Sequence, residues 1–528
     1  MILFLITFFF IFALICAKNI RYGIYAVIFL MPLYLIRFSI FGIPTTVLEI
    51  MIYILFLTLV LNSILLRRSS LLRDSGEFRV CSCREQACLF STERLQRGVN
   101  YFKKNNSILL IGIILLFLGL ILSILHSSDL RTSLGICKGW FFDPFLFFIV
   151  FMSVIKKTEH IKLSLASWVL SGIAVSLISI IYLLNNELTF DGRLRAFYIS
   201  PNYLAMYLAP VFLIVLFFLL RDLHAWSVKR SGAEFDLKKH LILFSGRTPL
   251  SLRSTLQSVK LKHIKYQALN VVVLIIILIP LFFTHSYGAF LGIFAVVIWL
   301  FYRKYKVYIS KQYLSFPQSH LSFPRRREST ATINDRLRGG RKIKKQSSKI
   351  LVLIILIAFV SITAIKFNQV ANSENRSSLH SRLMIWNASM EIIKDNPIFG
   401  IGPGTFQEVY LSYSEKFDEP YLEWAVAQPH NTFLAFYLQT GLIGLIGFVL
   451  ILFWFFRLGL KRKNNNIQYS IFNILISLMI YILVHGLVDT IYWKNDLSLM
   501  FWLVVGLLLT SSQIYDTILS QDEKGKEH

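Results

Sequence analysis

Apolar runs separated by short polar connections extend along most of the chain. An α-helix needs about 20 apolar residues to cross the hydrocarbon core of a bilayer, and most of the runs come close to that length. The pattern predicts an all-α polytopic membrane protein with thirteen transmembrane helices, or twelve, because two of the runs are short. The runs lie at 2–17, 22–37, 46–66, 107–125, 139–154, 161–183, 199–220, 266–283, 288–302, 350–366, 431–456, 469–486 and 497–515.

The composition supports the membrane class. Hydrophobic residues make up 55% of the 528 residues and aromatic residues 15%, and the mean hydropathy is +0.61. The formal net charge is +26, but Lys and Arg gather in the connections between apolar runs, where the positive-inside rule places them. The chain has no basic domain interleaved with aromatic residues, so we expect no nucleic-acid partner.

The charges of the connections indicate the orientation. Residues 303–349 carry 14 Lys+Arg against 2 Asp+Glu, a net of +12. Residues 221–265 carry 10 against 3 (+7), and residues 67–106 carry 9 against 4 (+5). By contrast, residues 367–430 carry 4 against 8, a net of −4. Because positively charged connections stay in the cytoplasm, the three basic segments are predicted to be cytoplasmic and 367–430 periplasmic.

The basic segments lack the apolar periodicity that would pack them. We interpret them as cytoplasmic insertions that act as spacers, with binding to anionic lipid head groups as the alternative. The predicted organisation, in chain order, is N-terminal helices (1–66), an insertion (67–106), helices (107–220) with an outer loop at 184–199, an insertion (221–265), a helical hairpin (266–302), an insertion (303–349), a helix (350–366), the periplasmic segment (367–430), C-terminal helices (431–515) and a cytoplasmic tail (516–528).

The periplasmic segment has a local pattern of its own. Apolar residues recur at steps of three and four, at Leu383, Trp386, Met390 and Ile393. This spacing predicts a short helix with one apolar face, lying along the membrane surface. Asn396-Pro397 predicts the end of that helix, and the glycines of GIGPG (400–404) predict a tight turn that leads the chain back.

Charged residues within the predicted spans indicate where the polar chemistry lies. Arg37, Glu49 and Asp143 each fall near the end assigned to the outer face, and no predicted span has a charge near its midpoint. Ionisable groups in a membrane are costly and usually functional. A transporter more often places such groups near the middle of the membrane. The pattern therefore favours a protein with its functional site at the outer leaflet over a transporter or lipid flippase.

Three arginines and one histidine on the outer side could serve the transfer of a sugar from a lipid-linked pyrophosphate. Arg193, Arg195 and Arg382 can donate to phosphate oxygens while staying charged; the alternative is that they are interfacial anchors. His430, at the start of a span, can accept a proton near neutral pH, although a histidine there is often structural. Asn431 can cap the helix or orient the ring.

Metal sites find little support in the sequence. The outer segments contain no Asp-x-Asp motif and no His or carboxylate cluster with metal-ligand spacing. We therefore expect neither a cofactor nor a metal ion, with arginines stabilising the leaving group.

Several stretches resemble a known family. These are Arg382 to Trp386 (R-x3-W), NPIFGIGPGTF, HNTFLAFYLQTGLIGLIGF and, earlier, RAFYISPNYLAMYLAP (195–210). Together they resemble the O-antigen ligase and O-antigen polymerase superfamily. One departure is Ser286-Tyr287-Gly288, where family members often carry Ser-Arg-Gly.

The resemblance implies an inverting, metal-independent glycosyltransferase of the bacterial inner membrane. Its donor would be an undecaprenyl-pyrophosphate-linked glycan, and its acceptor a hydroxyl of the lipid A core. By motif position, Arg195 and Arg382 would bind the donor pyrophosphate, His430 would activate the acceptor, and Asp489 would orient partners. A repeat-unit polymerase and a protein O-oligosaccharyltransferase are the alternatives, since both use the same donor.

Overall fold

The part of the chain that the structure describes forms two compact units. The computed structural model describes residues 2–40, 42–74, 106–220, 250–313, 378–413, 416, 426–461 and 467–524. Unit 1 comprises Met1–Val215, Leu274–Gly292 and Leu379–His528, and unit 2 comprises Leu216–Val273 and Ile293–Ser378. All the candidate site residues fall in unit 1.

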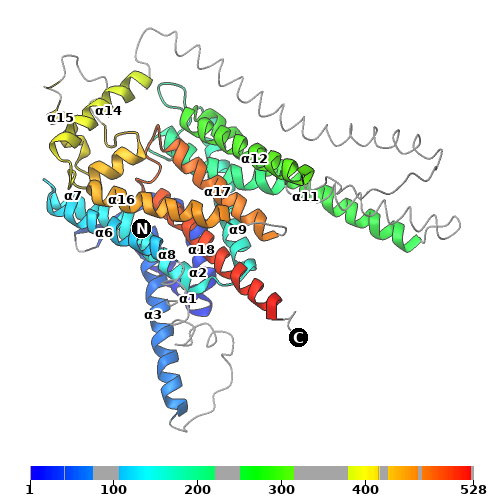
Figure 1. Ribbon diagram of the computed structural model, residues 1–528. Helices are drawn as coiled ribbons and strands as arrows, with labels where there is room; N and C mark the ends of the chain where they lie inside the picture. Colours follow the sequence, from blue (N-terminus) through cyan, green and yellow to red (C-terminus); the bar gives the residue numbers. More distant parts are fainter. Residues whose placement is uncertain are drawn as a thin grey trace, which may run out of the picture. The chain divides into compact units, whose positions relative to one another are not determined.

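Helices make up most of the described chain, which confirms the predicted helical class (Figure 1). In chain order they are α1 (Ile2–Lys18), α2 (Ile20–Phe29), η1 (Met31–Leu35), α3 (Val47–Asp74), α6 (Ser107–Leu125), α7 (Leu130–Ile136), η2 (Cys137–Phe142), α8 (Asp143–Val154), α9 (Thr158–Leu184), an unlabelled helix (Pro201–Leu220), α11 (Leu250–Phe283), α12 (Tyr287–Tyr313), α14 (Ser378–Asp395), α15 (Phe406–Ser412), α16 (Thr432–Lys461), α17 (Ile467–His485) and α18 (Asn495–Lys524).

Seven helical stretches in the described residues are long and apolar enough to cross a membrane. A further group of apolar helices has 10–17 residues each. The expected span at 350–366 lies outside the described residues, so the number of spans, the orientation and the domain boundaries stay predictions. The seven stretches are Val47–Leu65, Ser107–Leu125, Leu130–Val154, Thr158–Leu184, Pro201–Leu220, Thr432–Lys461 and Asn495–Gln521.

The predicted span at 22–37 is wrong. Helix α2 ends at Phe29, and a short 3-10 turn (η1) follows, with Pro32 in its first turn. Proline has no backbone N–H to continue a helix. The chain then forms an antiparallel hairpin of β1 (Arg37–Ile40) and β2 (Ile43–Thr46), which the all-α prediction missed. Gly42 supplies its turn with a positive φ of 78°.

The expectation that every charge lies near the end of its span also fails, at Asp143. The expected span began at residue 139, but helical structure is continuous from Leu130 to Val154 through a wider π-type turn at η2. Asp143 therefore lies near the middle of this stretch, where it accepts a 2.7 Å hydrogen bond from the Tyr53 hydroxyl. Glu49 does lie at a helix start, in the first turn of α3, where Lys138 Nζ lies 2.7 Å from its carboxylate.

Two helices of unit 1 pack so closely that only glycine fits between them. A Cβ atom added to Gly119 of α6 would lie 2.2 Å from the backbone nitrogen of Gly444 of α16. A Cβ atom on Gly447 would lie 2.3 Å from the backbone nitrogen of Leu116. Small residues allow this approach in membrane proteins, where packing rather than hydrophobic burial drives helix association. The contact anchors α16, which begins two residues after His430.

Candidate functional site

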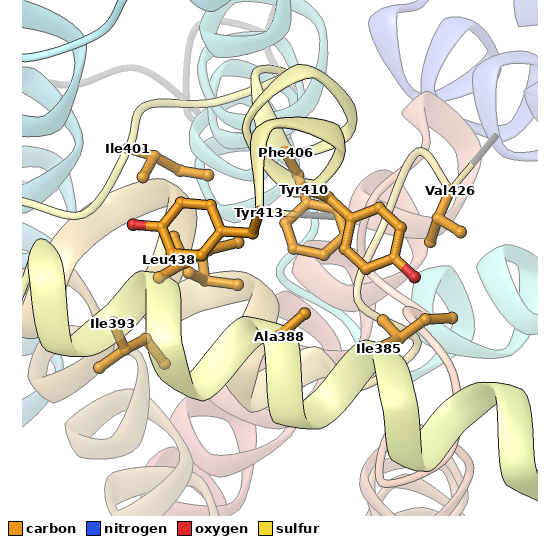
Figure 2. Packing of buried hydrophobic residues seen from close by; sticks show 10 residues of the cluster. Ile385, Ala388, Ile393, Ile401, Phe406, Tyr410, Tyr413, Val426 and Leu438 are labelled. Atoms are coloured by element: carbon orange, nitrogen blue, oxygen red, sulfur yellow. The ribbon is translucent and has the colours of Figure 1, made fainter. Parts of the chain in front are cut away.

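Helix α14 docks through a face that matches the predicted one only in part. It contributes Ile385, Ala388, Ile392 and the predicted Ile393 to a core cluster with Phe406 and Tyr410 of α15. Figure 2 shows this packing. The predicted face was wrong in part, as shown by the exposed fractions of Leu383 (47%) and Met390 (48%). Both faces of this helix are apolar, so periodicity alone did not identify the packed one.

The loop after α14 enters a break in α16. The helix ends at Asp395, and Gly400, Gly402 and Gly404 all have positive φ, which confirms the predicted stop and turn. Gly441 interrupts α16 with φ +67°. At this break Ile401 donates its N–H to Leu438 O (2.7 Å), and Leu442 donates to Ile398 O (3.0 Å). The loop thus satisfies backbone groups that the break leaves unpaired.

Asn431 caps the start of α16. Its side-chain oxygen accepts the backbone N–H groups of Phe433 (2.9 Å) and Leu434 (3.1 Å), which is the geometry of an N-cap. Its amide nitrogen donates to Leu487 O at 3.0 Å. Of the two roles predicted for Asn431, the structure supports the cap.

His430 directly precedes this cap and has a positive φ of 47°. Its Nδ1 lies 3.1 Å from Asp489 Oδ1, so the ring is oriented by Asp489 rather than by Asn431. The His430 side chain is 30% exposed, whereas that of Asp489 is 5% exposed. The arrangement is a buried carboxylate beside a histidine that stays partly exposed.

Asp489 lies in the connection between α17 and α18. Burial raises the pKa of its carboxyl, but the hydrogen bond to His430 and the charges of His430, His485 and Arg382 outweigh burial and hold the pKa below its usual range. A carboxylate only accepts hydrogen bonds. We therefore assign the proton of the imidazole to Nδ1, which leaves the Nε2 lone pair on the opposite side of the ring.

Backbone hydrogen bonds fix the Asp489 connection against the start of α16. Thr432 donates its N–H to Gly486 O (2.7 Å) and its hydroxyl to Asp489 O (3.2 Å). Arg382 Nε donates to Val488 O at 2.8 Å, so α14 also reaches this connection. Residues distant in sequence are thus held around one carboxylate.

The three predicted arginines have different surroundings. Arg382 is half-buried beside the Asp489 connection. Arg193 is also half-buried, and its guanidinium donates to Thr284 O (2.8 Å) and to Asn202 Oδ1 (2.5 Å). Arg195 is exposed, and its side chain has no hydrogen bond or ion pair within the described residues. The structure therefore brings Arg193 and Arg382, but not Arg195, into contact with the neighbourhood of Asp489.

Residues 272–449 match the family model of O-antigen ligase. This region of the chain is similar to the O-antigen ligase family. The match confirms the resemblance noted in the sequence, and it includes Arg382, His430 and Asn431 but not Arg193, Arg195 or Asp489. No curated protein matched the chain in a sequence search.

The match to the O-antigen ligase family indicates a function of the ligase or polymerase type, with glycan and lipid-linked substrates in general. The apolar helices, together with the family, indicate a multi-pass bacterial membrane protein.

The Ser286-Tyr287-Gly288 segment of the O-antigen ligase region lies close to the same residues. A Cβ atom on Gly288 would lie 2.5 Å from His485 Cδ2, so a larger residue would displace the His485 ring.

Sequence reasoning missed Asn202 and Thr284. Asn202 Nδ2 donates to Asp489 Oδ2 at 2.9 Å, which connects Arg193 to the His430 pair. The only signal for Asn202 was its place after Pro201 in the stretch that resembles the family. Within the described residues, no group of three or more His, Cys, Asp or Glu side chains could hold a metal ion.

Proposed function

We propose that this protein transfers a glycan from undecaprenyl pyrophosphate to an acceptor hydroxyl at the periplasmic face of the inner membrane, with the lipid A core as acceptor. The observation that carries the proposal is the pairing of a partly exposed His430 with the buried Asp489 carboxylate at 3.1 Å. Such a pair orients an imidazole and stabilises the imidazolium that forms when it accepts a proton.

The proposed reaction begins with the acceptor hydroxyl near His430 Nε2. The hydroxyl oxygen attacks the anomeric carbon of the donor sugar while the bond from that carbon to the pyrophosphate oxygen breaks. His430 takes the hydroxyl proton, and the bond electrons leave with undecaprenyl pyrophosphate. Attack opposite the leaving group inverts the anomeric centre. The products are the new glycoside and the lipid pyrophosphate, and His430 then returns its proton to solvent.

Arginines are proposed to bind the leaving pyrophosphate without a metal ion. Arg382 fits this role because its Nε bond to Val488 O holds the guanidinium beside the histidine pair. Arg195 fits because it is exposed and has no protein partner within the described residues. A guanidinium offers several N–H donors in one plane and suits phosphate oxygens.

A repeat-unit polymerase is the second candidate, because the family match supports a ligase or polymerase type without separating them. The two differ only in the acceptor. Purified protein in nanodiscs can be given one lipid-linked glycan donor with lipid A core, a second lipid-linked glycan or a glycosylatable protein. We expect glycan transfer to the lipid A core; transfer only to another acceptor would replace the ligase assignment.

The base role is tested by His430→Gln, which retains hydrogen bonding without basicity. Loss of a positioned general base costs about 10²- to 10⁴-fold in rate, so we expect a fall in kcat of that size with the donor still bound. His380→Gln, on the exposed side of α14, is the matched control. Near-normal transfer by His430→Gln would refute the base assignment.

A further inference from the structure

Asn202 and Arg193 lie on the side of the Asp489 carboxylate that faces away from His430. We propose that both are positioning residues for the reaction: they hold Asp489, and through it the Nδ1–H tautomer of His430, rather than binding the donor. The expected effect on rate rests on the proposed base role of His430. The expected effect on the His430 tautomer does not depend on that role.

The two oxygens of Asp489 have separate partners. Oδ1 lies 3.1 Å from His430 Nδ1 and accepts the backbone N–H of Thr490 at 2.9 Å. Oδ2 accepts the side-chain amide of Asn202 at 2.9 Å. Three donors therefore fix the plane of one carboxylate, and the His430 bond depends on that plane because rotation would move Oδ1 away from the ring.

The amide of Asn202 can hydrogen-bond to both of its neighbours. An ionised carboxylate only accepts hydrogen bonds, and a guanidinium only donates them. A residue between them must donate on one side and accept on the other. The amide does so, because its Nδ2 faces Asp489 and its Oδ1 accepts from Arg193 Nη2 at 2.5 Å. The two neighbours thus assign the amide orientation without ambiguity.

Arg193 is held in place by hydrogen bonds other than the one to Asn202. Its Nε donates to Thr284 O at 2.8 Å, and the next residue, Leu194, donates its N–H to Phe283 O at 2.8 Å. The Arg193 backbone N–H donates to Thr189 Oγ1 at 3.1 Å. The end of α11 therefore holds the arginine in place, and the arginine holds the amide.

The surroundings of Arg193 differ from those of the other two arginines. Its Nη1 lies 3.8 Å from Asp191 Oδ2, so each of its three nitrogens faces a protein oxygen. A guanidinium with these partners is suited to hold the Asn202 side chain in place rather than to bind a phosphate. The series Thr284, Arg193, Asn202, Asp489 and His430 then sets which imidazole nitrogen carries the lone pair.

The experiment measures transfer kinetics and the His430 tautomer in the same variants. Asn202→Leu removes both hydrogen bonds at similar volume, and Arg193→Gln removes the guanidinium. Asn387→Leu, at an exposed position of α14, is the control. We expect both test variants to lower kcat by about 10- to 100-fold, the range seen when partners that orient a functional histidine are removed. We expect the donor KM to change by less than about twofold, because a residue that does not bind the donor should affect kcat and not KM.

The tautomer is read by ¹⁵N NMR of histidine-labelled protein, with the His430 signals assigned by their loss in His430→Gln. Wild-type protein should show Nδ1–H, and Asn202→Leu a mixture of tautomers. An unchanged tautomer in a folded Asn202→Leu protein would overturn the inference. A raised donor KM with normal kcat in Arg193→Gln would do the same, because it would return Arg193 to donor binding. If wild-type protein shows no transfer at all, the proposed function fails, whereas the tautomer result still tests the positioning.

Discussion

Trp386 of α14 donates a hydrogen bond from its indole Nε1 to the carbonyl oxygen of Pro429, at 3.1 Å. Pro429 directly precedes His430, whose backbone has a positive φ. Helix α14 also carries Arg382, so one helix contacts the chain on both sides of the His430 pair: Pro429 through Trp386 and Val488 through Arg382.

Replacing Trp386 by Phe tests this contact. The ring remains, but the N–H is lost, and a typical intramolecular hydrogen bond contributes about 0.5–1.5 kcal/mol to stability. We expect a small fall in Tm and a larger relative fall in kcat, because the carbonyl next to His430 loses its donor. Thermal unfolding and transfer rate are measured on one preparation. Leu383→Ala, on the exposed face of α14, should leave both unchanged.

Gly441 should not tolerate a side chain. A Cβ atom there would lie 2.4 Å from Ile398 O, and its φ of +67° disfavours any L side chain. Gly441→Ala should cost about 1–3 kcal/mol. Gly135→Ala is the matched control, because Gly135 lies in α7 with no atom within 4 Å of an added Cβ; it should be neutral or stabilise by up to about 1 kcal/mol. Equal Tm values for the two variants would contradict this account of the break in α16.

The lowered pKa of Asp489 predicts how the pair responds to acid. A carboxyl whose folded-state pKa lies below its unfolded value of about 3.9 adds stability above that value, and the contribution is lost as the pH falls below it. Asp489 should therefore stay ionised from pH 5 to 9 and contribute no step to the rate profile there. The Tm difference between wild type and Asp489→Asn should therefore not shrink as the pH falls from 9 to 5, and it should shrink below about pH 4. A difference that shrinks between pH 7 and pH 5 would contradict the lowered pKa.

Arg382 and Arg195 should respond differently to lysine. Arg382→Lys loses the Nε bond to Val488 O as well as the planar fork, whereas Arg195→Lys keeps an exposed charge. If both bind the donor, replacing either arginine by Ala should raise the donor KM. Replacement by Lys should bring the KM closer to the wild-type value at Arg195 than at Arg382. Binding of a lipid pyrophosphate without glycan, measured by titration, checks the assignment. Normal binding in both Ala variants would remove phosphate recognition from their roles.

The orientation is tested with reporter fusions after Ser310 and after Gln407. The net charges of +12 and −4 in the segments that contain them predict a cytoplasmic and a periplasmic signal, respectively. Matching signals at the two positions would overturn the predicted orientation and with it the proposed site.

Local chemistry determined a large part of this protein from sequence alone. The apolar run at 107–125 became α6 with the same bounds, because a continuous run of that length has one solution in a bilayer. Asn396-Pro397 and the glycines after it ended α14 and turned the chain, and Asn431 capped α16. Each of these signals acts over a few residues and needs no tertiary contact.

Only the tertiary structure decided which face of α14 packs and which residues meet at the site. Ile385 and Leu383 are equally apolar, and in a membrane protein both lipid and protein core accept such side chains, so the pattern cannot separate the two faces. Asn202, Asp489 and His430 lie in three separate segments, and their pairing spans 287 and 59 residues of sequence. Residue types predicted the chemistry each could perform, but hydrogen bonds over such separations exist only once the helices have packed, since no local pattern encodes them.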